Sequence, residues 1–231
     1  MSRRYWEWPL PFTWDPGRTG LLVIDMQQGF TEPGAPLEVP MAREQVPTIA
    51  GLLDAFRDRD LPVFHTRFVI KHDEFIPFYR ARAPQRGLVV DAERPSFDPD
   101  SDEASIAPLL QPRDDEPVVD KIAYDGFADT ALESLVRSQG VDTLVIAGTV
   151  VNWCVDSTLR GAFHRRFQCI VVADGVSGYE HAGATGRQWV DQELDLFAEC
   201  FAAVMPAVDV IDGLADPARR TAGTLPTAST A

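Results

Sequence analysis

The stretch DTLVIAGTVVNWCVDSTLRGAF, residues 142–163, changes its hydrophobic pattern halfway along. Its first part, DTLVIAG, holds a continuous apolar run, which is typical of a strand buried on both faces of a parallel sheet. Its last part places Val155, Leu159 and Phe163 on one face of a helix. The stretch therefore predicts a strand followed directly by a helix, with Cys154 in the turn that joins them.

The same alternation of strands and helices continues outward from this stretch in both directions. Further strands are predicted at residues 19–26, 61–66, 117–121, 168–175 and 202–207. Helical spacing of apolar residues is found in the segments 46–56, 132–136 and 190–201. Strands that alternate with helices form a mostly parallel sheet with helices on both faces. We therefore expect an α/β fold, a three-layer α/β/α arrangement around a mostly parallel six-stranded Rossmann-like sheet.

The chain is expected to form one domain with a short extension at each end. Residues 19–213 contain the predicted strands and helices, without a linker or an internal repeat. Residues 1–18 are rich in tryptophan and proline, which predicts an extended arm packed on the domain. Residues 214–231, with their Pro, Thr, Ala and Gly, predict a flexible tail. Residues 67–116 lack any period, and such a long stretch inside a domain usually forms a lid or an oligomer contact.

The composition argues against several classes of partner. The 231 residues carry a net charge of −14, and the sequence pI is about 4.6. Nucleic acids and anionic membranes need clustered Lys and Arg, so we expect neither as a partner. No apolar run reaches the roughly 18 residues of a transmembrane helix. Three cysteines without paired spacing and the absence of a signal-peptide pattern lead us to expect a cytoplasmic protein.

Three chemically capable side chains stand at the carboxyl ends of predicted strands. Asp25 ends the first strand, Lys121 ends the third, and Cys154 lies a few residues after the fourth. In an open parallel sheet, ligands bind outside the carboxyl ends of the strands. If these strands are neighbours, the three side chains converge on one rim of the sheet. This convergence predicts an active site there.

The three groups suit nucleophilic catalysis by a thiol. A cysteine of ordinary pKa, about 8.5, reacts as the thiolate, and a helix N-terminus together with a lysine ammonium would favour that form. Asp25 would accept the thiol proton, and backbone N–H groups of the turn before Cys154 would stabilise an oxyanion. Structural roles remain open, because Cys154 could be a small buried residue, Asp25 a cap and Lys121 an exposed edge charge.

Three motifs resemble those of the isochorismatase-like cysteine hydrolase superfamily. They are LLVIDMQQGF at residues 21–30, VVDKIAYDGFADTALE at residues 118–133 and VIAGTVVNWCVDSTLRGAFHRRFQCIVVADGVSG at residues 145–178. Their order and spacing match the family over most of residues 19–205. The resemblance implies a catalytic triad of Asp25, Lys121 and Cys154.

The resemblance also implies the geometry around the nucleophile. It places a non-proline cis peptide bond at Val150–Val151, and an oxyanion hole made by the backbone N–H groups of Val151 and Cys154. The family commonly has Thr at the position of Val151, so a hydroxyl contact is missing here. The family's Ser-Ala-Phe-like triplet after the lysine is replaced by Asp-Gly-Phe at residues 125–127, which adds a carboxylate near the site.

Nicotinamidases of this superfamily hold a metal through an Asp-x-His pair and a further histidine. The corresponding region of this chain has His65 and His72 but no Asp-x-His. We therefore expect no catalytic metal and no cofactor, and we expect both histidines to serve packing or the surface.

Within the superfamily, the chain is most similar to the amidohydrolases of ureidoacrylate and biuret and, more loosely, of N-carbamoylsarcosine. The resemblance implies a cysteine amidohydrolase that cleaves a small amide, ureido or carbamoyl substrate through an acyl-thioester intermediate. The predicted substrate-binding side chains are Phe30, His65, Arg67, Tyr124, Phe127, Asn152 and Trp153. Arg67 would pair either with a substrate carboxylate or with one of the many acids of this chain. Relatives are usually dimers or tetramers, so we also expect a homo-oligomer.

Two other functions stay open. Isochorismatase itself hydrolyses a vinyl ether on the same scaffold, and there the cysteine is dispensable. A non-catalytic relative would keep the fold and act as a binding subunit. Iodoacetamide labelling tests the activated thiolate: if Cys154 reacts no faster than Cys169 or Cys200 at pH 7, the activated-thiolate hypothesis is wrong.

Overall fold

The computed structural model describes residues 8–71, 76–90 and 93–215, and it is built around one six-stranded sheet. The strands are β1 (Thr19–Ile24), β2 (Val63–Phe68), β3 (Val118–Lys121), β4 (Thr143–Thr149), β5 (Gln168–Ser177) and β6 (Ala203–Met205). Every neighbouring pair is parallel, in the order β3-β2-β1-β4-β5-β6. The predicted α/β fold is confirmed, with a sheet that is wholly rather than mostly parallel.

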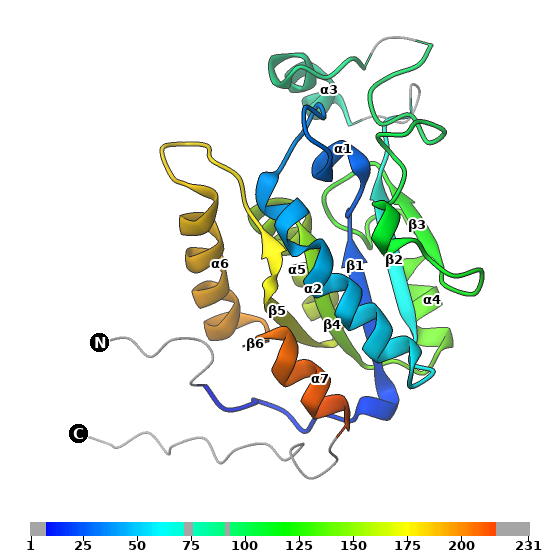
Figure 1. Ribbon diagram of the computed structural model, residues 1–231, viewed down its shortest axis with the longest axis vertical. Helices are drawn as coiled ribbons and strands as arrows, with labels where there is room; N and C mark the ends of the chain where they lie inside the picture. The colour runs from blue at the N-terminus through cyan, green and yellow to red at the C-terminus, as the bar shows by residue number, and fades with distance from the viewer. Residues whose placement is uncertain (1–7, 72–75, 91–92, 216–231) are drawn as a thin grey trace.

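Helices cover both faces of the sheet, as the three-layer prediction requires (Figure 1). One face carries α2 (Pro40–Arg57) and α7 (Ala207–Ala215). The other face carries α4 (Leu132–Ser138), α5 (Asp156–His164) and α6 (Gly186–Cys200). Two short helices lie beyond the carboxyl ends of the strands, namely α1 (Gln28–Thr31) and α3 (Pro77–Arg82). Short turns of other helical types are η2 (Pro16–Arg18), η3 (Ala83–Arg86), η4 (Pro108–Leu110) and η5 (Val151–Val155).

Continuous apolar runs in the sequence form the central strands. All six residues of β1 and all seven of β4 are buried, because helices cover both faces of these strands. β3 lies at an edge of the sheet, and its first residue, Val118, is 38% exposed. The two central strands are therefore fully buried, whereas the edge strand β3 is partly exposed.

The strand order reverses direction between β1 and β4. β2 and β3 lie on one side of β1, whereas β5 and β6 lie beyond β4. At such a reversal the connections leave in opposite directions and open a crevice at the carboxyl ends of the two strands. Gly148 of β4 has a φ of 132°, and a Cβ atom there would overlap the carbonyl oxygen of Ile24. The ends of β1 and β4 therefore touch at the crevice.

The described part of the irregular stretch 67–116 is attached to the carboxyl end of the sheet by Gln27. The Gln27 amide donates to the carbonyl oxygens of Phe68 and Ala104 at 2.9 and 3.1 Å. Its oxygen accepts the Phe68 backbone N–H at 2.7 Å. This single buried side chain joins three segments that are distant in sequence, and it places the stretch over the crevice.

The ends of the described chain pack against the domain. Trp14 is buried, and its indole N–H donates to the hydroxyl of Thr19 at 2.8 Å. α7 continues to Ala215, so the first two residues of the segment 214–231 belong to this helix. Residues 1–7 and 216–231, with most of the predicted tail, lie outside the described residues. Within the described ranges, no helix combines the length and apolarity needed to cross a membrane.

Candidate functional site

Asp25 follows the last residue of β1 and is fully buried. Its φ of 52° lies in the left-handed region, which few residues other than glycine adopt. Its backbone N–H donates to the carbonyl oxygen of Thr66 at 3.2 Å, and the Thr66 hydroxyl donates to Asp25 Oδ1 at 2.7 Å. The end of β2 therefore holds both the backbone and one carboxylate oxygen of Asp25.

Lys121, the last residue of β3, joins the carboxylate to the thiol. Its Nζ lies 2.7 Å from Asp25 Oδ2, 3.2 Å from Cys154 Sγ and 2.9 Å from the carbonyl oxygen of Ala123. An ammonium has three N–H donors, so each of them has a partner here. Burial opposes the charged form, but the attraction of Asp25 and Cys154 outweighs it and raises the pKa of Lys121. Lys121 is therefore an ammonium at neutral pH.

Cys154 lies in η5, just before α5, and is 6% exposed. Burial, together with the nearby Asp25 carboxylate, raises the pKa of its thiol to about 12, against the opposing effect of Lys121. Loss of water around the thiol therefore outweighs the attraction of the lysine. Cys169 is also buried and Cys200 is exposed, so iodoacetamide should label Cys200 first.

The turn between β4 and α5 positions the backbone near the nucleophile. The cis peptide bond joins Thr149 to Val150, one residue before the predicted position at Val150–Val151. The reason is that Val150 is still extended and the helical turn begins only at Val151. The carbonyl oxygen of Val150 accepts the N–H groups of Trp153 and Val155 at 3.0 and 3.1 Å. This wide turn carries the predicted oxyanion-hole donors.

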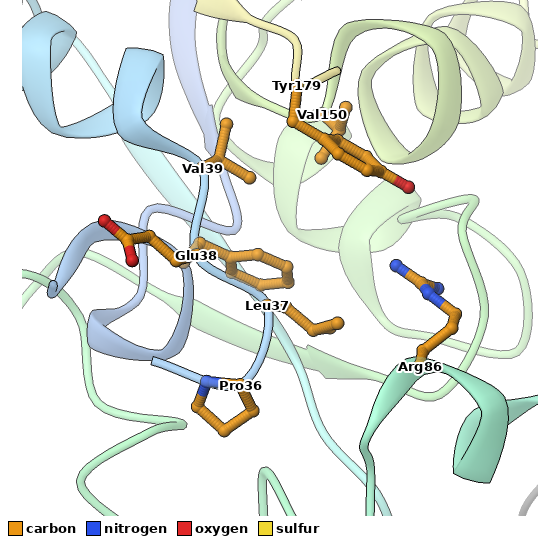
Figure 2. Close-up of a pocket in the computed structure, with 8 residues that line it drawn as sticks. Pro36, Leu37, Glu38, Val39, Arg86, Val150 and Tyr179 are labelled. Atoms are coloured by element: carbon orange, nitrogen blue, oxygen red, sulfur yellow. The ribbon is translucent and has the colours of Figure 1, made fainter. Parts of the chain in front are cut away.

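A cavity of about 280 Å³ adjoins this turn (Figure 2). Its lining residues are Phe30, Pro36, Leu37, Glu38, Val39, Arg86, Val150 and Tyr179. Figure 2 shows the Arg86 guanidinium facing the Tyr179 phenol, with Glu38 across the cavity from both. Cys154 does not line the cavity itself, but Val150 belongs to the turn that carries it. The cavity therefore borders the turn that carries the thiol.

Trp153, immediately before the nucleophile, is the centre of an aromatic cluster. Its ring centroid lies 5.9 Å from that of Tyr124, 5.4 Å from that of Tyr179 and 5.7 Å from that of His181. Tyr79 continues the cluster at 5.9 Å from Tyr124. Burial raises the pKa values of Tyr79, which is 9% exposed, and of Tyr124, which is 38% exposed.

The Asn152 amide is oriented by His181. The Nδ1 atom of His181 lies 3.0 Å from the carbonyl oxygen of Tyr179, and its Nε2 lies 3.2 Å from Asn152 Nδ2. Since a carbonyl oxygen only accepts, Nδ1 carries the proton and Nε2 accepts from the Asn152 amide. The His181 ring is stacked between Tyr179 and Trp189, at 4.5 and 4.7 Å. Asn152 Oδ1 is left buried without a hydrogen-bond donor in the described ranges.

Three predicted substrate-binding residues lie away from the cavity. Arg67 donates to both carboxylate oxygens of Asp120, at 2.8 and 3.0 Å, so it forms the internal salt bridge that was the second possibility. His65 is fully buried, with Nε2 3.5 Å from Glu116 Oε2. Phe127 is 4% exposed and stacks on another phenylalanine of the core. Arg67 and Phe127 therefore have partners inside the protein, whereas the buried His65 ring has no hydrogen-bond partner in the described ranges.

The remaining predicted binding residues stay near the turn, and they are Phe30, Tyr124, Asn152 and Trp153. Sequence reasoning missed Arg86, Tyr179 and His181. Tyr179 and His181 closely follow the end of β5, so the strand-end argument applied to this strand would have found them. Arg86 carries no such signal, because it lies in the irregular stretch. His72, considered as a metal ligand, lies outside the described residues.

Asp125, which departs from the family's triplet, faces α5 rather than the cavity. Its Oδ1 accepts the backbone N–H of Phe127 at 2.8 Å, and its carboxylate lies directly against Gly161. Burial raises the pKa of Asp125, although this hydrogen bond and Arg165 oppose the change. The carboxylate closes its own turn and does not line the cavity.

Sequence comparison gives a consistent set of relatives. A family model of the isochorismatase domain matches residues 19–209. A ureidoacrylate amidohydrolase from Methylobacterium radiotolerans is 31% identical over 184 residues, which cover 72% of this chain and 69% of the relative. A maleamate amidohydrolase from Pseudomonas putida is 32% identical over 161 residues, which cover 69% of this chain and 72% of the relative.

Solved structures give the same result. A cysteine hydrolase from Pseudomonas syringae pv. phaseolicola superposes with a TM-score of 0.80 at 25% identity, covering 94% of this chain and 100% of that one. An N-carbamoylsarcosine amidase from Thermoplasma acidophilum superposes with a TM-score of 0.67 at 26% identity, covering 82% and 96%.

Proposed function

The chain belongs to the isochorismatase family, and on this premise we propose that it is a cysteine amidohydrolase. Its reaction is the hydrolysis of a non-peptide C–N bond in a small amide or ureido compound, a class that the names of its relatives support. One observation carries the proposal. Lys121 Nζ lies 2.7 Å from Asp25 Oδ2 and 3.2 Å from Cys154 Sγ, so one buried ammonium contacts both a carboxylate and a thiol.

In the first half of the reaction, Cys154 Sγ forms a bond to the substrate carbonyl carbon. Since the resting thiol is neutral, its proton passes to Asp25 as the sulfur attacks. The carbonyl electrons move to oxygen, and the backbone N–H groups of Val151 and Cys154 stabilise this oxyanion. The protonated Asp25 then donates to the departing nitrogen, the C–N bond breaks, and an acyl-thioester remains on Cys154.

In the second half, water attacks the thioester carbonyl. Asp25 takes the proton of the water, the C–S bond breaks, and the sulfur regains a proton from Asp25. The sum is an amide and water converted to an acid and ammonia or an amine, with the protein unchanged. Lys121 keeps its charge throughout and holds the carboxylate and the sulfur in contact range.

Asn152 supports an amide or ureido substrate in particular. Its Oδ1 is a buried acceptor with no protein donor in the described part of the chain, and His181 prevents the amide from turning over. An unpaired buried acceptor costs about 1–3 kcal/mol, which a substrate N–H would recover. An ester of the same shape has no such hydrogen, so Asn152 would favour amides over esters.

The test is ammonia release from small amides, ureido acids and N-carbamoyl acids. We expect the wild-type protein to hydrolyse at least one of them, and Cys154→Ala to lose about 10³-fold or more of that activity. Cys169→Ala is the matched control, because this buried cysteine has no catalytic neighbour, and it should retain turnover. Hydroxylamine should cleave the acyl-thioester on Cys154 and release the acyl group as a hydroxamate, which can be measured.

Two outcomes would contradict the proposal. Amide hydrolysis retained by Cys154→Ala would exclude the thiol as nucleophile. Cleavage of the vinyl ether isochorismate, without ammonia release from any compound of the panel, would assign the site to the other reaction of this family.

A further inference from the structure

Arg86, the last residue of η3, reaches the cavity through aromatic side chains. Its guanidinium carbon lies 4.1 Å from the ring centroid of Trp153 and 5.9 Å from that of Tyr79. Its Nη1 donates to the Tyr79 hydroxyl at 3.3 Å, and its charge opposes the rise that burial causes in the pKa of Tyr179. The cation is therefore held by Trp153 and Tyr79, two aromatic side chains of the cluster beside the nucleophile.

These contacts leave the charge of Arg86 uncompensated. Other arginines that pack against the domain bind carboxylates, as Arg57 binds Glu116 and Arg67 binds Asp120. Among the described residues, no carboxylate lies within 4.0 Å of the Arg86 guanidinium. A chain with 35 acidic and 21 basic residues has acids to spare, so their absence around a half-buried arginine indicates a place for an external anion.

The cavity has one charged end that is already neutralised and one that is not. Glu38 accepts hydrogen bonds from Arg43 and from the Gly34 backbone N–H, so its charge is satisfied by its own neighbours. It stands across the cavity from Arg86 (Figure 2). Among the described residues that line the cavity, Arg86 is therefore the charged side chain that lacks a counter-charge.

Arg86 and the nucleophile lie on the same aromatic wall. Trp153 contacts the guanidinium and is joined directly to Cys154 in the chain. The charges of both Arg86 and Cys154 act on the pKa values of Tyr79 and Tyr124, which burial raises above their ordinary value. Arg86 and Cys154 therefore both lie beside the aromatic cluster around Trp153.

We propose that Arg86 binds a carboxylate of the substrate, so that this enzyme acts on small amide or ureido compounds that carry an anionic end. The inference rests on the proposed amidohydrolase function and specifies its substrate class. A guanidinium offers a planar pair of N–H donors that matches a carboxylate. Stacking on Trp153 and the hydrogen bond to the Tyr79 hydroxyl hold this pair in place before the substrate arrives, which lowers the entropy cost of binding.

The test compares substrates that differ only in charge. The pairs are maleamate with its uncharged diamide, and 3-ureidoacrylate with its primary amide. The quantity measured is the ratio of kcat/KM for the anion to kcat/KM for the neutral partner. We expect Arg86→Met to lower this ratio about 10–100-fold, mostly through KM, because the lost interaction is a charged hydrogen bond made before and during reaction.

Two further variants separate charge from structure. Arg86→Lys keeps the charge without the planar pair of donors, so the ratio should fall less than in Arg86→Met. Arg82→Met is the matched control, because Arg82 is exposed and stacks on Phe78, and the ratio should stay within about twofold. An equal loss on both members of each pair, or an unchanged ratio in Arg86→Met, would overturn the proposal.

Binding measurements distinguish this proposal from the proposed reaction. Cys154→Ala with and without Arg86→Met is titrated with the same pairs by calorimetry, which needs no turnover. Tighter binding of the anion that disappears with Arg86→Met supports the carboxylate site even if no compound is hydrolysed, and then only the proposed reaction fails. Equal binding of anion and neutral partner in Cys154→Ala overturns the carboxylate site even if the wild-type protein releases ammonia.

Discussion

Strand β3 has a buried ion pair at each end, and the two pairs are built differently. Just before the strand, Glu116 binds Arg57 through two hydrogen bonds of 2.7 Å each. At its last residue, Lys121 contacts Asp25 once, at 2.7 Å, and its next neighbour is the Cys154 thiol. All four charged side chains are largely withdrawn from water.

The two carboxylates differ in how many hydrogen-bond donors already surround them. The Arg113 backbone N–H adds a further hydrogen bond to Glu116 at 2.9 Å, and His65 lies at 3.5 Å. Burial by itself would raise the pKa of Glu116, but its donors together lower it well below the ordinary range. Asp25 Oδ2 has only the lysine contact in the described ranges. A saturated carboxylate keeps its charge and supports the fold, whereas a carboxylate with a free lone pair can receive a proton.

The largest expected effect follows from removing the lysine. Lys121→Met leaves Asp25 buried without its cation and separates it from the thiol, so we expect activity to fall about 10³-fold or more. The free energy of unfolding should fall by about 3–5 kcal/mol, because one member of a buried pair is left alone. Turnover and urea unfolding of the same preparation measure both. Retained turnover would show that the Lys121–Asp25 pair is structural, like the Arg57–Glu116 pair.

Glu116→Gln should affect stability without affecting catalysis. The change leaves Arg57 without a carboxylate, and we expect a loss of about 3 kcal/mol at neutral pH. The value of kcat should stay within about threefold, because Glu116 lies at the opposite end of β3 from the thiol. Loss of turnover in a folded Glu116→Gln protein would show that both pairs serve the reaction.

The lowered pKa of Glu116 predicts that the stability difference between the wild-type protein and Glu116→Gln depends on pH. A carboxyl whose pKa is lower in the folded than in the unfolded state adds stability above the unfolded value, about 4.3, and this stability is lost as pH falls toward the folded value. The wild-type protein should therefore lose its advantage over Glu116→Gln as pH falls from 7 to 3. Chemical unfolding at several pH values checks this, and a constant difference would contradict the lowered pKa.

Gly148 tests the close contact between the ends of β1 and β4, beside the catalytic ion pair. Gly148→Ala places a methyl group against the Ile24 carbonyl oxygen in a left-handed backbone, so stability should fall by more than about 1 kcal/mol and turnover should fall with it. Gly51→Ala is the matched control, since its Cβ meets no atom within 4 Å and alanine is favoured in α2, which should raise stability by up to about 1 kcal/mol. Thermal unfolding and activity assays of both variants measure these changes, and an unchanged Gly148→Ala protein would contradict the close contact.

The smallest effect is expected at an exposed pair. Arg187 and Asp191 lie 3.3 Å apart on α6, with side chains 66% and 47% exposed. Asp191→Asn should change the free energy of unfolding by less than about 0.5 kcal/mol. A change as large as that of Glu116→Gln would mean that burial does not determine how much an ion pair contributes to the free energy of unfolding.

The strand-end argument brought Asp25, Lys121 and Cys154 together from the sequence, because apolar runs mark strands and parallel strands share one carboxyl edge. It named Arg67 as a substrate-binding arginine and missed Arg86, which lines the cavity. Arg67 is paired in register with Asp120 on the adjacent strand, a neighbour known only once the sheet order is known. Arg86 depends on stacking with Trp153, which is distant in sequence and without periodic signal.

The pKa of the thiol could not be predicted from the sequence for a related reason. A lysine and a helix start are visible in the sequence, and both favour the thiolate. The loss of water around Cys154 depends on packing from several distant segments, and this term is larger. Charges near a residue can be inferred from motifs, whereas desolvation has to be read from the fold.

The neutral thiol has a consequence for the lifetime of the protein. Hydrogen peroxide oxidises thiolates far faster than thiols. With a pKa of about 12 and only 6% of its surface exposed, Cys154 offers almost no thiolate to an oxidant while the site is empty. The exposed Cys200 reacts first and lies outside the machinery of the reaction. Burial therefore protects the nucleophile from irreversible oxidation between turnovers.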